Sequence, residues 1–159
     1  SLKLGLLREP GVAVTDVPKL GDDDVLPERA QVIVPVSAMN AASLRALQYA
    51  RSLGIRDTTA VYFADHEEEA EAMRDDWRRF PTGVPLDVVE DPYRDVGQPL
   101  LEYLRRVTAD PQAVAVVVMP ELIVRGTDRL LHNQRALYLK RLLLFEPRVI
   151  LTSVPFQLT

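Results

Sequence analysis

The chain has 159 residues, of which 47% are apolar and 26% charged, a balance typical of one globular domain with its own core. The formal net charge of −4 argues against a nucleic-acid backbone as the main partner, because such binders usually carry a basic excess. The chain has no cysteine, which excludes a disulfide framework and a thiolate metal site, and its longest apolar run, residues 113–120, is too short to span a membrane.

Residues 1–29 differ in composition from the rest of the chain. Three prolines and a run of three aspartates interrupt them, which predicts a linker or lead-in segment with one short strand at Val12–Thr15. The chain begins at Ser1 and shows no signal peptide, and we interpret it as a soluble, cytosolic fragment of a longer protein. A single α/β domain is expected over residues 30–159.

The first two strand–helix units follow this segment. Gln31–Val36 is an apolar run typical of a buried strand, and Asn40–Leu53 has the apolar spacing of a helix that Gly54 ends. Thr58–Ala64 is predicted as the second strand, and residues 67–80 as the second helix, whose charged face is expected to lie in solvent. The apolar face of this helix is expected to consist of Ala70, Met73, Trp77 and Phe80.

Two more units and a final strand complete the pattern. Leu86–Glu90 is predicted as the third strand, Gly97–Thr108 as a helix with its leucines inward, and Asp128–Phe145 as the fourth helix. Ala113–Met119 is the most uniformly apolar strand, as expected of a central parallel strand covered on both faces. Arg148–Val154 is the fifth strand, and we expect it at an open edge of the sheet.

The regular alternation of strand and helix predicts the fold class. It implies right-handed βαβ crossovers and therefore an α/β fold with a doubly wound, five-stranded parallel sheet of the Rossmann-like kind. Ligands of such sheets bind at the carboxyl ends of the strands, where the strand order reverses. The loops that follow Val36, Ala64, Glu90 and Met119 are therefore the ones to inspect.

The first and third of these loops carry candidate ligand-binding residues. Ser37 and Asn40 are able to cap the following helix, or alternatively to hold an adenosine or a phosphate. Tyr93 offers a stacking face, and Arg94 offers a planar fork suited to a phosphate. The alternative for these two is a turn in which the tyrosine packs on the sheet and the arginine pairs with a neighbouring aspartate.

The loop after the fourth strand, residues 121–126, and the start of the fourth helix carry a mainly basic group. Helix N-termini present free amides and a partial positive charge to anions, so we take these side chains as ligand candidates. A solvated or dimer-facing patch is the alternative. The residues are Arg125, Arg129, His132 and Asn133.

Several patterns of catalytic and metal sites are absent from the sequence. It has no glycine-rich phosphate loop of the Walker type and no nucleophile elbow, and no motif pairs two carboxylates for acid–base work. His66 and His132 are far apart in the chain, and no metal site is expected. The residues therefore predict a protein that is not an enzyme.

The alternation and the length resemble the universal stress protein fold. The ATP-binding members of that family carry a glycine motif after the fourth strand, of which this chain has only Gly126. Three segments, PERAQVIVPVSAMNAASLRALQYARSL, EDPYRDVGQPLLEYL and LLHNQRALYLKRLLLFEPRVILTSVPFQL, more closely resemble the cytosolic C-terminal domain of bacterial amino acid–polyamine–organocation superfamily permeases. Among these, the segments are most similar to the KimA-type potassium importers.

This resemblance implies a universal-stress-protein-like regulatory domain of an amino acid or potassium permease, at the cytoplasmic face of the bacterial inner membrane. It implies a homodimer beneath the permease domain of the same polypeptide, with no required cofactor and no nucleic acid, and with cyclic di-AMP or ATP as a regulatory ligand. Two alternatives stay open. One is a free-standing universal stress protein that binds ATP, with weak hydrolysis, and the other is a ligand-free dimerisation module.

Overall fold

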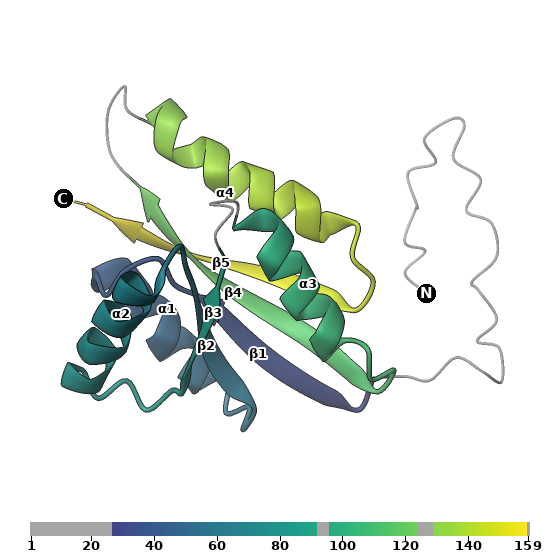
Figure 1. Cartoon of the computed structure of the whole chain (residues 1–159). Helices are drawn as coiled ribbons and strands as arrows, with labels where there is room; N and C mark the ends of the chain where they lie inside the picture. Colours follow the sequence, from purple (N-terminus) through teal and green to yellow (C-terminus); the bar gives the residue numbers. More distant parts are fainter. Residues whose placement is uncertain (1–26, 92–95, 124–128, 159) are drawn as a thin grey trace, which may run out of the picture.

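Five strands and four helices alternate along the described part of the chain in the computed structural model (Figure 1). It describes residues 27–91, 96–123 and 129–158, with the backbone alone for 129–135. The predicted strand at Val12–Thr15 therefore lies outside the described residues. The strands are β1 Arg29–Pro35, β2 Thr58–Ala64, β3 Leu86–Glu90, β4 Ala113–Ile123 and β5 Val149–Gln157. The helices are α1 Ala41–Ser52, α2 Glu67–Arg79, α3 Gly97–Val107 and α4 Arg129–Leu144.

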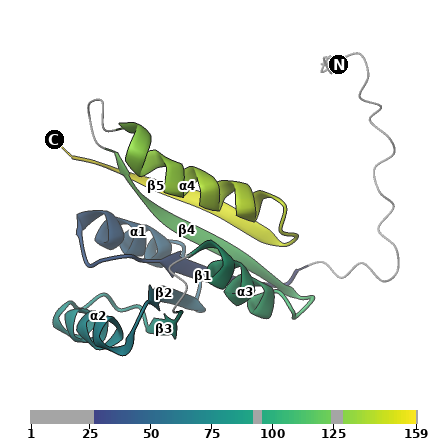
Figure 2. The same ribbon diagram turned by 45° about the horizontal axis from the view of Figure 1, so that its top comes forward.

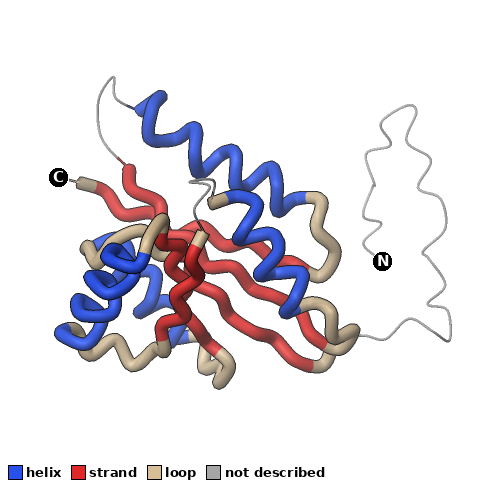
Figure 3. The backbone as a smooth tube through the Cα atoms, in the orientation of Figure 1, coloured by secondary structure: helices blue, strands red, loops and turns tan. Residues whose placement is uncertain are grey.

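The sheet is parallel throughout and has the order β3-β2-β1-β4-β5. From β1 the chain builds β2 and β3 on one side, and then returns to build β4 and β5 on the other side. The helices α1 and α2 cover one face of the sheet, and α3 and α4 cover the other (Figures 1 and 2). Figure 3 shows the strands enclosed between these two helical layers. The predicted doubly wound fold is confirmed.

The central strands contribute side chains to two separate apolar layers. Val32 and Val34 of β1 pack under α1 and α2, whereas Ile33 between them packs under α3 and α4. Alternate residues of a strand point to opposite faces, and both faces of this strand are covered. This double burial explains why the central strands are continuous apolar runs in the sequence.

The ends of α1 agree with the sequence prediction to within a residue. Asn40 caps the helix, because its side-chain oxygen accepts a hydrogen bond from the backbone N–H of Ser43 at 2.9 Å. After the C-cap residue Leu53, Gly54 has a φ of +67°. This left-handed conformation carries no steric penalty for glycine, and it turns the chain away from the helix axis.

The fourth and fifth strands are longer than the sequence predicted. They pair with each other as far as Ile123 and Gln157, through Pro120 and Pro155. The β1 ladder on the other side of β4 stops at Val117, and prolines are tolerated in a sheet where one side has no strand beside it. The prediction that β4 ends at Met119 and a loop begins at Glu121 was therefore wrong, as was the end of β5 at Val154.

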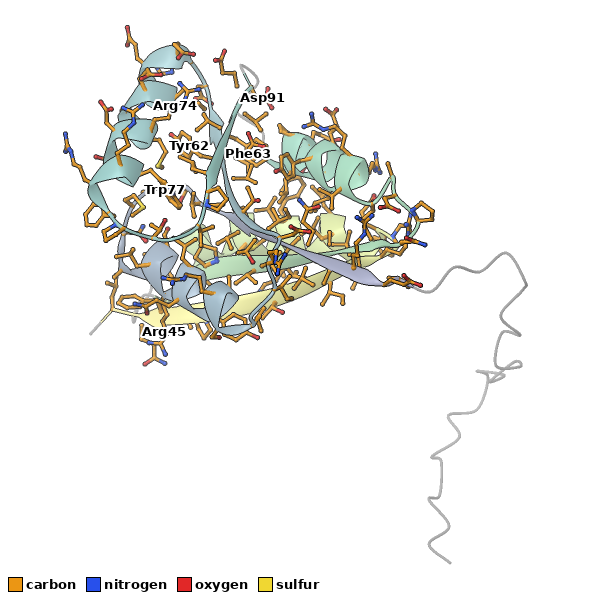
Figure 4. The ribbon with its side chains drawn as sticks, turned by 90° about the horizontal axis from the view of Figure 1, so that it is seen from below. Arg45, Tyr62, Phe63, Arg74, Trp77 and Asp91 are labelled. Atoms are coloured by element: carbon orange, nitrogen blue, oxygen red, sulfur yellow. The ribbon has the colours of Figure 1, made fainter. Side chains whose placement is uncertain are left out.

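The end of α2 differs from the predicted apolar face. Phe80 was expected to point inward, but its backbone is extended (φ −108°, ψ 119°) after the last helical residue, and its side chain is 46% exposed. Trp77 fixes this end of the helix instead (Figure 4). Its indole Nε1 donates a hydrogen bond to the backbone oxygen of Val84 at 2.9 Å, which ties the helix to the loop before β3.

Candidate functional site

A pocket of about 360 Å³ opens at the carboxyl ends of the central strands, on the face covered by α3 and α4. The strand order reverses between β1 and β4, and this is the position where doubly wound sheets bind their ligands. Its volume lies at the lower end of the range of small-molecule sites. The described lining residues are Pro35, Val36, Ser37, Tyr62, Phe63, Val96, Met119, Pro120, Glu121, Leu122, Ala136 and Leu139.

Two adjacent residues of β2 meet this site from different sides. Figure 4 shows Tyr62 and Phe63 on opposite sides of the strand, with Tyr62 toward α2 and Phe63 toward α3. Phe63 packs with the apolar layer under α3 and α4, and Tyr62 with the other layer. Burial raises the pKa of Tyr62, as do the nearby carboxylates of Glu69 and Asp65. The phenol therefore stays neutral at physiological pH, and both rings line the pocket, Phe63 from the side of α3 and Tyr62 from the side of α2.

The two candidates of the first loop have different roles. Ser37 is exposed and lines the pocket. Asn40 is used as the cap of α1 and is not among the described lining residues. The neighbouring backbone is fixed by Ser43, whose hydroxyl donates to the oxygen of Ala38 at 2.7 Å. The capping alternative therefore accounts for Asn40, and Ser37 remains as a pocket residue.

The other candidates belong to parts of the chain that the structure does not describe in full. Tyr93, Arg94 and Arg125 lie outside the described residues, and so do the side chains of Arg129, His132 and Asn133 in the first turns of α4. The described ends of β3 and β4 place the origins of these loops at one edge of the sheet. Because β2 and β1 lie between them, those origins are about 14 Å apart at the usual strand spacing.

An ion pair at the rim of the pocket was not anticipated from the sequence. The Nζ atom of Lys140 on α4 donates to Oε2 of Glu121 on β4 at 2.9 Å. The two side chains are 33% and 19% exposed, respectively. No periodic pattern relates two residues 19 positions apart on a strand and a helix. The two side chains are in contact because Glu121 lies within β4, next to α4, and not in a loop.

The outer end of the sheet, where β3 stops, is acidic. The carboxyl groups of Glu90 at the end of β3 and Glu67 at the start of α2 are close enough to share a proton. This interaction raises the pKa of Glu90 and lowers that of Glu67, and the Arg74 guanidinium also lowers the pKa of Glu67. Arg74 contacts the Glu67 carboxylate at 3.0 Å. Because these two carboxyl groups repel anions and Arg74 is engaged by Glu67, an anionic ligand bound at this end would require cationic side chains from the neighbouring loops.

Replacing Glu90 with glutamine is expected to raise the thermal midpoint at pH 7 and to change it little near pH 4. The pKa of Glu90 is raised because its protonated form hydrogen-bonds Glu67 and its ionised form is repelled by that carboxylate; the glutamine amide keeps a donor and lacks the charge. As the pH falls through the raised pKa, Glu90 becomes protonated and the difference disappears. Thermal unfolding at both pH values tests this, with Glu68→Gln in the same helical turn as the control. An equal gain at both values would contradict it.

No group of His, Asp or Glu side chains able to hold a metal ion, and no helix long and apolar enough to cross a membrane, is found within the described parts of the chain. A search of curated proteins gives no match. A family model described as the KimA potassium transporter C-terminal domain matches residues 28–156, which is most of the chain. The chain therefore belongs to the family of KimA potassium transporter C-terminal domains.

Proposed function

We propose that this chain is the ligand-sensing regulatory domain of a potassium transporter, and that its ligand is an adenine nucleotide, cyclic di-AMP before ATP. The observation that carries the proposal is the 360 Å³ pocket at the carboxyl ends of β1 and β4, where the topology of the sheet favours ligand binding. Family membership supplies the transporter context. The domain acts from the cytoplasmic face of the membrane, by binding rather than by catalysis.

The lining of the pocket supports a ligand with a flat, apolar part. Phe63, Met119 and Leu139 contribute apolar surface, and the described polar side chains that line the pocket are those of Ser37, Tyr62 and Glu121. Ligand pockets usually combine such an apolar wall with a few polar groups that fix orientation. The predicted cations, Arg94 among them, belong to the loops that leave the same edge, where the phosphates of a nucleotide would lie.

Calorimetric titration with cyclic di-AMP, ATP and AMP tests this function. We expect cyclic di-AMP to bind most tightly, with one dinucleotide for two chains. Tighter binding of ATP, together with its hydrolysis, would favour the free-standing stress-protein alternative. If none of the three binds below millimolar concentration, the ligand-free dimerisation module becomes the better interpretation.

The edge strand β5 supports a homodimer as the assembled form. Among the described strands its neighbour in the sheet is β4, and Ile150 on it is 51% exposed. Beside this edge, a shallow groove between α1 and β5 is lined in part by Tyr49 and Phe156. Exposed apolar edges are usually covered by a partner, and a two-fold axis would use the same surface twice. A symmetric dinucleotide suits such an axis.

Replacing Ile150 with lysine is expected to convert this dimer to a monomer. The new charge would lie at the edge strand, and lysines on edge strands oppose pairing between strands. Light scattering at high micromolar concentration measures the mass, which should fall from twice the 17.9 kDa of the chain to a single copy. Phe80→Lys, at the end of α2, is the control because its side chain is 46% exposed and lies away from β5. A monomeric parent protein would count decisively against the dimer.

A further inference from the structure

We infer that the pocket binds the adenine base of the ligand and leaves its phosphates outside, and that Glu121 recognises the base by accepting a hydrogen bond from its exocyclic amino group. This inference rests on the proposed function. It adds a specificity-determining residue that lies on a strand and not in any of the loops.

The charged side chains at the pocket favour binding of the base of a nucleotide over binding of its phosphates. Glu121 lines the pocket, and its carboxylate accepts a hydrogen bond from the Lys140 ammonium at 2.9 Å. A phosphate inside the pocket would meet the carboxylate and would have to compete with it for the lysine. Like charges at short range disfavour this arrangement, so the phosphates lie outside, toward the loops.

The described lining has more apolar than polar side chains. A buried polar atom that lacks a hydrogen-bond partner is costly, and a ribose has oxygen atoms around its ring and no flat apolar face. A purine needs partners only at its edge, whereas its two faces pack against apolar side chains such as Phe63 and Met119. The base therefore fits the described lining better than the sugar does.

The Glu121 carboxylate has acceptor capacity left after pairing with Lys140. The lysine uses Oε2, and within the described residues Oε1 forms no hydrogen bond. An ionised carboxylate is an acceptor only, so it suits the amino group of adenine and opposes the carbonyl oxygen of hypoxanthine at the same position. Lys140 acts as a positioning residue that fixes the direction of the carboxylate.

A pair of matched ligands tests this assignment. Cyclic di-AMP and cyclic di-IMP, or ATP and ITP, differ at this position of the base and share the same phosphates. The parent chain should bind the adenine form about ten- to a hundred-fold more tightly, which is the usual effect of one charged hydrogen bond. Glu121→Gln should bring the two affinities close together, because the amide group presents either a donor or an acceptor.

Two further variants separate the inference from the proposed function. Arg94→Ala should weaken both ligands equally and leave their ratio unchanged, whereas Lys140→Met should reduce the ratio and Lys140→Arg should restore it. Thermal unfolding of each empty variant shows whether it is folded. If no adenine nucleotide binds the parent chain, the proposed function fails and the inference fails with it. If adenine nucleotides bind and Glu121→Gln keeps the parent's preference, the inference alone is wrong.

Discussion

Replacing Leu104 with alanine is expected to lower the free energy of unfolding by about 2–5 kcal/mol, the range found for buried leucines. Leu104 of α3 is fully buried and packs in the apolar layer with Ile33 and Val117 from the two central strands. The substitution removes apolar contacts on both strands at once and leaves a cavity that the rigid sheet cannot close. Denaturant unfolding followed by circular dichroism measures the change.

A matched control exists on the same side of the sheet. Leu144, at the end of α4, is 76% exposed, and Leu144→Ala should change the free energy of unfolding by less than about 0.5 kcal/mol. The substitution is chemically identical, so the difference between the two variants measures burial alone. A loss of less than about 1 kcal/mol for Leu104→Ala would show that α3 does not cover the sheet in the way described here.

Replacing Arg94 with alanine is expected to weaken nucleotide binding about ten- to a hundred-fold. Arg94 lies outside the described residues, and the expectation comes from its loop at the carboxyl end of β3 and its planar fork of donors. A charged hydrogen bond to phosphate typically contributes about 1.5–3 kcal/mol, which converts to this change in affinity. Titration calorimetry with cyclic di-AMP measures it.

The thermal midpoint of the empty Arg94→Ala protein should stay near that of the parent, because the described side chains already form both apolar layers. Arg79→Ala on α2 is the control for a general loss of positive charge. Its side chain is 74% exposed and forms an ion pair with Asp76 on the same helix at 3.6 Å. If Arg94→Ala binds as well as the parent, the assignment of the phosphates to this loop is wrong.

Most of the fold was predictable because the sheet is buried on both faces. β2 and β3 have the boundaries expected from their apolar runs, and the inward leucines of α3 follow the helical period. The errors lie at the ends of elements, where tertiary contacts and not the local sequence pattern determine the last residue. β4 and β5 extend each other through two prolines, and Phe80 leaves the core because the chain becomes extended after Arg79.

The candidate site was predictable in position but not in composition. The rule that ligands bind where the strand order reverses names the edge at which the pocket lies, and Ser37 lines this pocket. It did not give Glu121 and Lys140, whose ion pair joins a strand to a helix, nor the aromatic face of Phe63. These features depend on contacts between side chains that form only when the helices pack on the sheet. No local pattern in the sequence predicts such tertiary contacts.

The strand order also constrains how the chain acquires its structure during synthesis. The central strand β1 pairs with β4, and Arg29 lies opposite Ala113 in that ladder, so one side of β1 has no partner until most of the domain has left the ribosome. Pairing between such distant segments is slow, and unpaired apolar strands are prone to aggregate. A chain that stops before β4 would expose Val32–Val34 along one edge. We therefore expect such truncated chains to need chaperones, whereas the complete domain folds as one unit.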